Sequence, residues 1–317
     1  MKDVVVFGCG YVGRRLARRL MSAGLRVAGT TTTESNLSAL AAHGIPGLLV
    51  DRDDPDTWKA ALAGARAVVH LAPPDEHAGA GAGAGVGAGA GATATGTVAA
   101  AARAFAFAAQ DAKVVVYGST TGAFGQPDDP EAWIDENSET NPASLGRRGG
   151  LRFAYEAALR DAGLPLRVAR ISAIYGPGRT LRASIEREAL LLFEGGPPTS
   201  RIHVDDLTRL LEAMLRPSAP SLVVACDEAP APTLEVARYT CALLGRPAPQ
   251  AVPRADAERV LSPRALEMRL QGRRCRSLVL SGLIGALDFP TYREGVRASL
   301  EAEGVMIAGE GRDMAVA

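Results

Sequence analysis

The stretch VVVFGCGYVGRR, residues 4–15, lies almost at the start of the chain and contains three signals of local structure. An apolar run at 4–7 predicts a buried strand, and Gly8, Gly10 and Gly13 follow it with the spacing GxGxxG. The next residues repeat apolar side chains every three or four positions, which predicts an amphipathic helix. A glycine-rich turn between a strand and a helix is typical of a dinucleotide-binding site.

Each glycine of this turn has a physical role in such a site. Gly8 permits the tight turn, Gly10 lets the backbone approach a pyrophosphate, and Gly13 lets helix and strand pack closely. The start of the helix adds free N–H groups and partial positive charge. We therefore predict that Gly8, Gly10, Tyr11, Val12 and Gly13 bind a dinucleotide.

The end of the second predicted strand bears on the choice of dinucleotide. NAD-binding sites usually place an acidic residue there to hydrogen-bond the ribose. This strand instead ends in four threonines, residues 30–33, and Glu34 comes only after them. Thr31 is the expected contact, and a hydroxyl tolerates a 2′-phosphate. NAD and NADP both remain open, with a slight preference for NADP.

Apolar runs followed by helix-length amphipathic stretches recur along the chain. They predict strands near residues 4–8, 26–31, 47–50, 67–72, 113–117 and 166–171. Strands that are almost wholly apolar and alternate with helices form parallel sheets covered on both faces. The fold class is therefore α/β, with a doubly wound parallel sheet of the Rossmann type.

Composition excludes several classes of partner. The 35 basic and 35 acidic residues cancel, so neither nucleic acid nor an anionic membrane is expected to bind. The four cysteines are far apart without metal-ligand spacing, so we expect no disulfide framework, no metal site and a cytoplasmic location. We expect neither a signal peptide nor a membrane span.

Residues 78–92 consist of glycine and alanine with a single valine. Such a segment has no large apolar group to bury and high backbone entropy. We predict a flexible loop there, with silk-like stacking as the alternative. The arginines at 14, 15, 18 and 19 are expected to form a solvated helix face, with phosphate steering as the alternative.

Several further motifs occur in a fixed order along the chain. They are DRD (51–53), VVHLAPP (68–74), TATGT (93–97), VYGSTTGAFG (116–125), RISAIYGPGR (170–179), RIHVDDL (201–207) and PTYREGV (290–296). Their order and spacing resemble the extended short-chain dehydrogenases/reductases of the NAD-dependent epimerase/dehydratase family. The GxGxxG form of the glycine turn is similar to an atypical bacterial subgroup of that family.

The resemblance implies a Rossmann domain and a smaller C-terminal lobe that closes over the substrate. The expected bounds are 1–171 for the Rossmann domain, with 200–225 returning to it, and 172–304 for most of the substrate lobe. We predict a loose tail at 305–317. Family members often form homodimers through two helices, which correspond here to 98–110 and 147–160, although a helix buried within the domain would have the same pattern.

The resemblance also implies further cofactor contacts. Asp51 would meet the adenine amino group. The full set of additional contacts is Asp51, Arg52, Leu71, Ala72, Pro73 and Ser119.

Typical members use a serine or threonine, a tyrosine and a lysine, the last two spaced YxxxK on one helix. The tyrosine moves a proton, and the lysine lowers its pKa. Thr120 takes the hydroxyl position, but Leu145 and Gly149 stand where the tyrosine and lysine belong. None of the three lysines of the chain has a tyrosine four residues before it. The usual dyad is therefore missing.

Nearby arginines are candidates to replace the lysine charge. Arg152 lies one helical turn beyond Gly149, and helical side chains lean toward the N-terminus. Its alternative interpretation is a surface arginine. Arg147 and Arg148 are weaker candidates, and Tyr155 is too far along the helix to replace the tyrosine.

The later motifs supply the remaining candidates. Tyr175 is a possible catalytic group, with packing against the following Gly-Pro turn as the alternative. Arg179 is a possible clamp for an anionic substrate group, because its fork suits phosphate or carboxylate. For His203, Asp205 and Asp206 the resemblance implies a structural role, in which the aspartates cap the next helix at the end where negative charge is favoured. A catalytic His203 is the alternative.

Two classes of function remain open. The first is an NAD(P)-dependent oxidoreductase or epimerase acting on a small or nucleotide-linked hydroxyl or carbonyl substrate. Thr120 and Tyr175 are its catalytic candidates, and Arg152 and Arg179 its substrate-binding candidates. The second is an NAD(P)-binding sensor with little or no turnover, which the missing dyad favours. The cofactor motifs suit either class.

Overall fold

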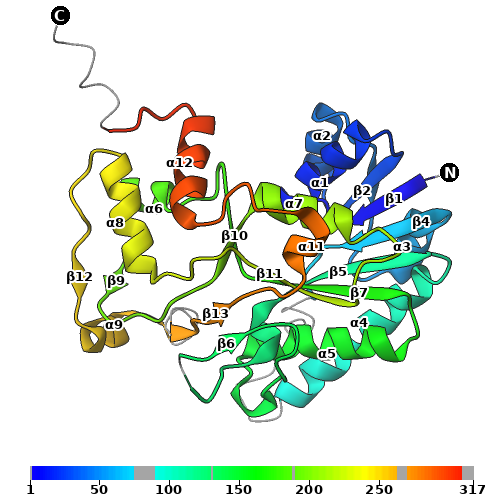
Figure 1. Cartoon of the computed structure of the whole chain (residues 1–317). Helices are drawn as coiled ribbons and strands as arrows, with labels where there is room; N and C mark the ends of the chain where they lie inside the picture. The colour runs from blue at the N-terminus through cyan, green and yellow to red at the C-terminus, as the bar shows by residue number, and fades with distance from the viewer. Residues whose placement is uncertain (1, 75–89, 130, 188–189, 263–269, 309–317) are drawn as a thin grey trace, which may run out of the picture.

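The computed structural model describes residues 2–74, 90–129, 131–187, 190–262 and 270–308. Its centre is a seven-stranded parallel sheet with the order β11-β7-β5-β4-β1-β2-β3 (Figure 1). The strands are β1 (Lys2–Phe7), β2 (Val27–Thr31), β3 (Gly47–Leu49), β4 (Ala65–His70), β5 (Val114–Thr120), β7 (Leu166–Ile171) and β11 (Leu222–Ala225). The predicted α/β class with a doubly wound parallel sheet is confirmed.

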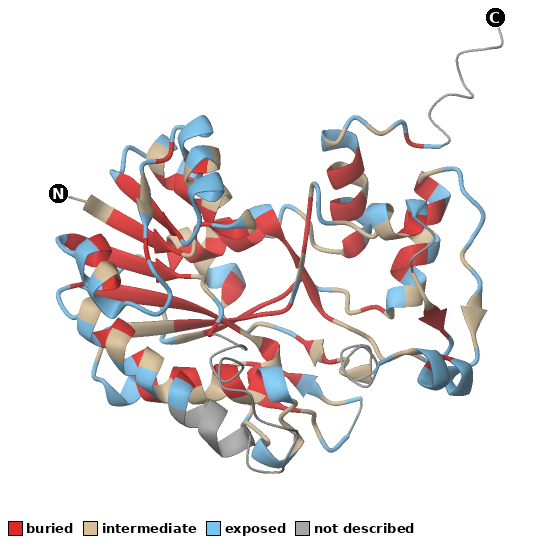
Figure 2. Cartoon of the chain, turned by 180° about the vertical axis from the view of Figure 1, so that it is seen from behind, coloured by how far each residue is buried: buried red, intermediate tan, exposed pale blue. Residues whose placement is uncertain are grey.

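Helices cover both faces of this sheet. The helices are α1 (Tyr11–Ser22), α2 (Glu34–Ala42), α7 (Val204–Ala213) and α11 (Leu280–Ile284) on one face, and α3 (Pro55–Leu62), α4 (Ala90–Ala108) and α5 (Arg147–Asp161) on the other. Alternate residues of β1 serve the two cores, because Val4 and Val6 pack in the first and Val5 and Phe7 in the second. Figure 2 shows buried residues running through the sheet and along the helices beside it.

The chain order creates a crevice in the middle of the sheet. The chain moves outward from β1 to β2 and β3, then crosses back to β4 and moves the other way to β5, β7 and β11. Ligands of such sheets bind at the carboxyl ends of the strands where the order reverses. That point lies between β1 and β4, so the glycine turn after β1 faces the loop after β4.

The remaining elements form a smaller group beside the sheet (Figure 1). They are α6 (Arg182–Glu186), α8 (Thr233–Leu243), α9 (Arg254–Val260) and α12 (Tyr292–Ala302), with the strand pairs β8 (Ala173–Tyr175) and β10 (Arg201–His203), β9 (Leu192–Phe193) and β12 (Ala251–Val252), and β6 (Trp133–Ile134) and β13 (Arg274–Cys275). Two short 3-10 helices, η1 (Thr121–Phe124) and η2 (Pro142–Ser144), lie between β5 and α5. A third hydrophobic cluster joins α8 and α12. The division into domains at residues 171 and 172 stays our proposal.

Some local predictions differ from the structure. Strand β11 was not predicted, although its residues were expected to return to the Rossmann domain. The predicted loop at 78–92 falls largely outside the described residues, but α4 already begins at Ala90. Residues 309–317 of the predicted tail also lie outside them. Ile307 is buried in the third cluster and the Ala308 N–H donates to the Leu243 carbonyl, so 305–308 belong to the fold.

Among the described residues, no helix has both the length and the apolar character needed to cross a membrane.

Candidate active site

The glycine-rich turn is held in place by close backbone packing. Gly8 has φ +88°, and a Cβ there would lie 2.5 Å from the backbone nitrogen of Ala72. The Gly8 N–H donates to the Thr30 hydroxyl at 2.9 Å. A Cβ at Gly13 would lie 3.1 Å from the Gly8 carbonyl oxygen and from a methyl carbon of Val6. The turn therefore accepts only glycine at Gly8 and leaves little room at Gly13.

Gly10 differs from its neighbours because a Cβ there would meet nothing within 4 Å. It forms the N-cap of α1 with no side-chain capping bond, so the first N–H groups of that helix are left for a ligand. Open space in front of free helix N–H groups fits a pyrophosphate. The residues present thus fit the dinucleotide that the motif implies.

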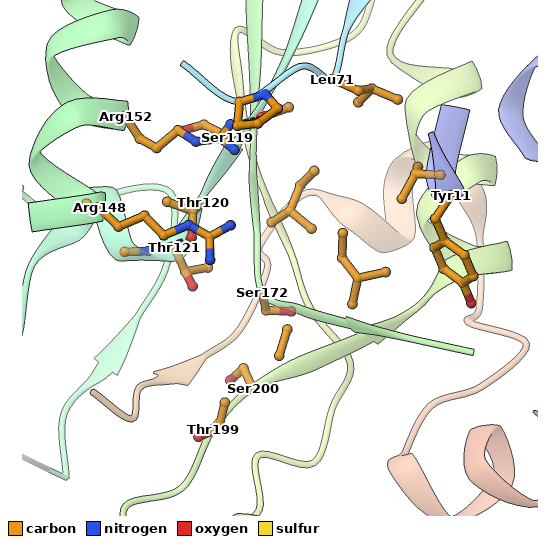
Figure 3. A pocket seen from close by; sticks show the side chains of 18 of the residues that line it. Tyr11, Leu71, Ser119, Thr120, Thr121, Arg148, Arg152, Ser172, Thr199 and Ser200 are labelled. Atoms are coloured by element: carbon orange, nitrogen blue, oxygen red, sulfur yellow. Dashed lines mark hydrogen bonds between the residues drawn. The ribbon is translucent and has the colours of Figure 1, made fainter. Parts of the chain in front are cut away.

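A cavity of about 740 Å³ begins at this turn and extends across the ends of the central strands. Its volume is in the usual range for small-molecule and cofactor sites. Eight predicted cofactor residues line it: Gly8, Gly10, Tyr11, Val12, Gly13, Leu71, Pro73 and Ser119. The predicted Thr120, Arg152 and Arg179 line it as well. Figure 3 shows Tyr11 and Leu71 on one side of the cavity and Arg148 and Arg152 on the other.

Four predicted cofactor residues do not line this cavity. Thr31 is buried and its hydroxyl accepts the N–H of Thr33, whereas Thr30, one position earlier, supports the turn. Asp51 and Arg52 are exposed beyond the end of β3. The backbone of Ala72 packs on Gly8, but its side chain is not part of the lining. The cofactor roles of these four residues stay predictions.

Tyr175 is also placed away from the cavity. Its side chain belongs to the third hydrophobic cluster, and its hydroxyl donates to the Thr291 carbonyl at 3.2 Å. Burial raises the pKa of this tyrosine above its usual range. Packing, the alternative considered for Tyr175, agrees with this position, and the catalytic role does not.

Thr120 and Ser119 have different surroundings although they are adjacent. The Thr120 hydroxyl lines the cavity and accepts the N–H of Gly122 at 3.2 Å, which caps η1. The Ser119 hydroxyl donates to the carboxylate of Glu156, a side chain with no exposed area. Glu156 pairs with the buried Arg170 at 2.9 Å. The Ser119 hydroxyl is therefore held by a buried carboxylate. Of these two hydroxyls, that of Thr120 is the more accessible to a substrate.

The structure explains why no lysine stands at residue 149. A Cβ on Gly149 would lie 2.3 Å from the carbonyl oxygen of Gly122, because α5 packs directly on η1. Leu145 precedes α5, which begins only at Arg147. The two positions that the YxxxK spacing would place on one helix are therefore not both on α5.

Arg152 is not the surface residue that the alternative interpretation required. Its side chain is buried, and it donates to the Gly118 carbonyl at 2.8 Å and the Tyr117 hydroxyl at 3.3 Å. It reaches the cavity from α5 one turn beyond Gly149, next to Arg148 (Figure 3). A fixed positive charge thus lies at this wall of the site.

His203 and the aspartates after it are architectural. His203 caps α7 by accepting the N–H of Asp205, and burial lowers its pKa. The Asp206 carboxylate accepts the N–H groups of Asp288 and Phe289, both at 2.9 Å. His203, Asp205 and Asp206 do not line the cavity.

Sequence reasoning missed several residues that line the site. They are Thr121, Ser172, Ala173, Ile174, Thr199, Ser200, Gln271 and Arg273. Thr199 and Ser200 directly precede the RIHVDDL motif, which was a usable signal. Gln271 and Arg273 belong to no motif, and only the folded chain brings them to the cavity.

Asp227 is a buried carboxyl just after β11 that we expect to give stability a pH dependence. Its side chain is buried, and burial raises the pKa of its carboxyl to about 7, although the Arg201 guanidinium opposes the shift. The unfolded chain releases this proton near pH 4, so raising the pH from about 4 to about 7 favours unfolding. We predict that Asp227→Asn removes this loss and is more stable than wild type by roughly 4 kcal/mol at about pH 8.

Urea unfolding across this pH range checks the prediction. The two proteins should have equal stability at the acidic end, where the carboxyl is protonated in both states. A variant that loses stability between these pH values as steeply as wild type would contradict the assignment to Asp227.

The fold and the glycine-rich crevice define a nucleotide-binding protein of the Rossmann class. Residues 4–224 match the model of the NAD-dependent epimerase/dehydratase family. The chain therefore belongs to that family.

Solved structures agree in fold. A functionally unknown conserved protein from Silicibacter pomeroyi DSS is 30% identical, with a TM-score of 0.75, and the match covers 95% of this chain and 99% of that one. The human epimerase family protein SDR39U1 with NADPH is 21% identical, with a TM-score of 0.72 and coverage of 94% and 99%. MoeE5 in complex with UDP-glucose and NAD is 18% identical, with a TM-score of 0.68 and coverage of 95% and 98%. At these last two identities the likeness concerns the fold alone. No curated protein matches the sequence.

Proposed function

We propose that this protein is an NAD(P)-dependent oxidoreductase or epimerase that acts on a hydroxyl or carbonyl group of a small or nucleotide-linked substrate. The observation that carries the proposal is the single cavity that joins the glycine turn to Thr120 and to Arg152. A sensor needs only the nucleotide end of this space. A wall with an accessible hydroxyl and a buried guanidinium supports chemistry on a second molecule.

The chain's own groups would divide the work as follows. The Thr120 hydroxyl hydrogen-bonds the reacting oxygen of the substrate, and the Arg152 charge stabilises negative charge that develops on it. Arg152 takes over the electrostatic role of the family's lysine, although it lies one helical turn beyond the position of that lysine. Bound NAD(P) supplies hydride transfer, which the protein side chains do not provide.

Proton transfer must differ from that of typical family members. Among the described residues that line the cavity there is no Asp, Glu, His, Cys or Lys. Arginine keeps its proton in proteins. We propose that the proton passes through the Thr120 hydroxyl to water or to a group of the substrate itself.

NADP is the cofactor that we propose. Strand β2 ends in the hydroxyl residues of the threonine run, and no carboxylate stands there to repel a 2′-phosphate. The exposed Arg52 follows the neighbouring strand β3. Tighter binding of NADPH than of NADH by calorimetry tests this choice.

Gly10→Ala is the sharpest test of the nucleotide site. The added methyl group enters open space in the apo protein but occupies the volume that a pyrophosphate needs. We expect thermal stability close to wild type and a loss of NADPH affinity of at least about tenfold, or ~1.4 kcal/mol. Calorimetric titration with NADPH measures the affinity.

Gly282→Ala is the matched control, because Gly282 is exposed in α11 and a Cβ there also meets nothing within 4 Å. It should bind NADPH as wild type does. Equal affinities in all three proteins would overturn the proposed nucleotide site. Wild type should also oxidise NADPH with at least one compound of a panel of nucleotide sugars and small carbonyls. Tight binding without any oxidation would favour the sensor.

A further inference from the structure

Arg273 carries a buried charge for which the described residues supply no carboxylate partner. Its side chain is 9% exposed, and its Nε donates to the Gly125 carbonyl at 2.6 Å. Its Nη2 atom is buried and has no hydrogen-bond partner among the described residues. No carboxylate of the described chain forms an ion pair with Arg273. A buried cation in this state is unfavourable, because it loses hydration without compensation.

Other buried arginines of the described chain are compensated. Arg170 is paired with Glu156 at 2.9 Å. Arg201 donates to two backbone carbonyls, those of Thr199 and Ala231, both at 2.7 Å. Arg152 also donates to two acceptors. Arg273 is thus the buried arginine of the described residues whose terminal nitrogen is left open, and it lines the cavity.

The backbone around Arg273 is held rigidly. A Cβ on the preceding Gly272 would lie 2.4 Å from both the Cβ of Pro197 and the carbonyl oxygen of Pro198. The Ser200 N–H and hydroxyl both donate to the Arg273 carbonyl at 3.1 Å. This close packing fixes the backbone of Arg273, and the bond from its Nε to the Gly125 carbonyl orients the guanidinium, so less entropy is lost when a ligand binds.

Arg273 lies on the substrate side of the cavity. Its backbone forms a bridge with Thr199. Figure 3 places Thr199 and Ser200 across the cavity from Leu71. Its bond to Gly125 joins it to the end of η1, whose N-cap is Thr120. A ligand on Arg273 would therefore occupy the same space as a substrate presented to Thr120, and not the glycine turn.

We propose that the substrate carries an anionic group, a carboxylate or a phosphate, that binds Nη2 of Arg273. This inference rests on the proposed function, because it names the class of substrate for the same site. The anion supplies the negative partner that Arg273 lacks among the described residues. The protein accepts an unfavourable buried charge in the free state and uses it for recognition.

Arg273→Met tests the proposal, because methionine keeps most of the aliphatic volume and removes the charge. We expect the ligand-free variant to melt at the same temperature as wild type or higher. A structural arginine would give the opposite result. We also expect inorganic phosphate or malonate to raise the melting temperature of wild type saturably, with an apparent affinity about tenfold weaker in the variant.

The two probes distinguish the two anion sources. An Arg273-dependent shift with phosphate alone assigns a phosphorylated substrate, and one with malonate alone assigns a carboxylate. Arg238→Met removes an exposed arginine of α8 and serves as the matched control, which should respond to both anions as wild type does. Lower stability of ligand-free Arg273→Met, or anion responses equal to wild type, would overturn the proposal.

Two further measurements separate this inference from the proposed function. Arg273→Met should bind NADPH as wild type does, since Arg273 belongs neither to the glycine turn nor to the predicted cofactor contacts. Gly10→Ala should keep the Arg273-dependent anion shift, because any phosphate bound at the turn is lost in that variant. If NADPH failed to bind wild type, the proposed function would be wrong, but the Arg273-dependent rise in melting temperature with phosphate or malonate could still be measured.

Discussion

Gly149→Ala should lower the free energy of unfolding by about 3 kcal/mol, at the upper end of the usual cost of overpacking. The added Cβ would lie 2.3 Å from the Gly122 carbonyl oxygen and 2.9 Å from its carbon. Both are backbone atoms, so α5 and η1 would have to move apart. Urea unfolding of wild type and variant measures the difference.

Gly150→Ala is the matched control in the same helix. A Cβ there meets only the Cβ of Leu145 at 3.9 Å, so alanine should stabilise α5 by roughly 0.5–1 kcal/mol through its helix propensity. Opposite signs at two adjacent glycines would show that close packing keeps position 149 free of a side chain. If alanine were tolerated equally at both positions, residue 149 would have room for a side chain, and close packing would not explain the absence of a lysine there.

Glu156→Gln should cost about 3–5 kcal/mol of stability, because it leaves the buried Arg170 without its counter-charge. Glu156 has no exposed area, and the Arg170 guanidinium contacts it at 2.9 Å while stacking 4.2 Å from the centre of the Phe124 ring. Glutamine keeps an acceptor for Ser119 and nearly the same volume. The loss would therefore report the charge, and urea unfolding measures it.

Arg160→Gln removes a second arginine from the same carboxylate. This pair spans 3.4 Å and its arginine side chain is 45% exposed, so its loss should cost less than about 1 kcal/mol. A similar loss in both variants would mean that burial does not decide the strength of these ion pairs. A loss below about 1 kcal/mol for Glu156→Gln would contradict the role given to Arg170.

The glycine turn and the central sheet could be predicted from the sequence because their signals are local. A turn that places backbone against backbone admits few residues besides glycine, and buried parallel strands require apolar runs. Strand β11 has the same apolar character, but its place at the sheet edge beside β7 depends on a long-range return of the chain. Local patterns contain no information on such returns, and the return of residues 200–225 was expected only from the family resemblance.

The substrate side of the site was less predictable for the same reason. Arg273 is placed at the cavity by long-range contacts, because its backbone bridges Thr199 and the next strand, β13, pairs with β6 about 140 residues away in the chain. Arg152 was found from helical spacing, but its burial depends on Tyr117 and Gly118 of β5. Tyr175 has a motif position that suggests chemistry, whereas the packing of α12 turns its hydroxyl to Thr291.

The return of the chain from β10 through α7 to β11 has a consequence for how this molecule can be dissected. A fragment ending at Ile171 would lack α7, which packs on α1, and would leave one side of β7 without its neighbour. Unpaired strand edges promote aggregation. We therefore expect that no single cut of the chain separates the complete sheet with its helices from the smaller group of elements, and that a fragment ending at Ile171 does not fold on its own.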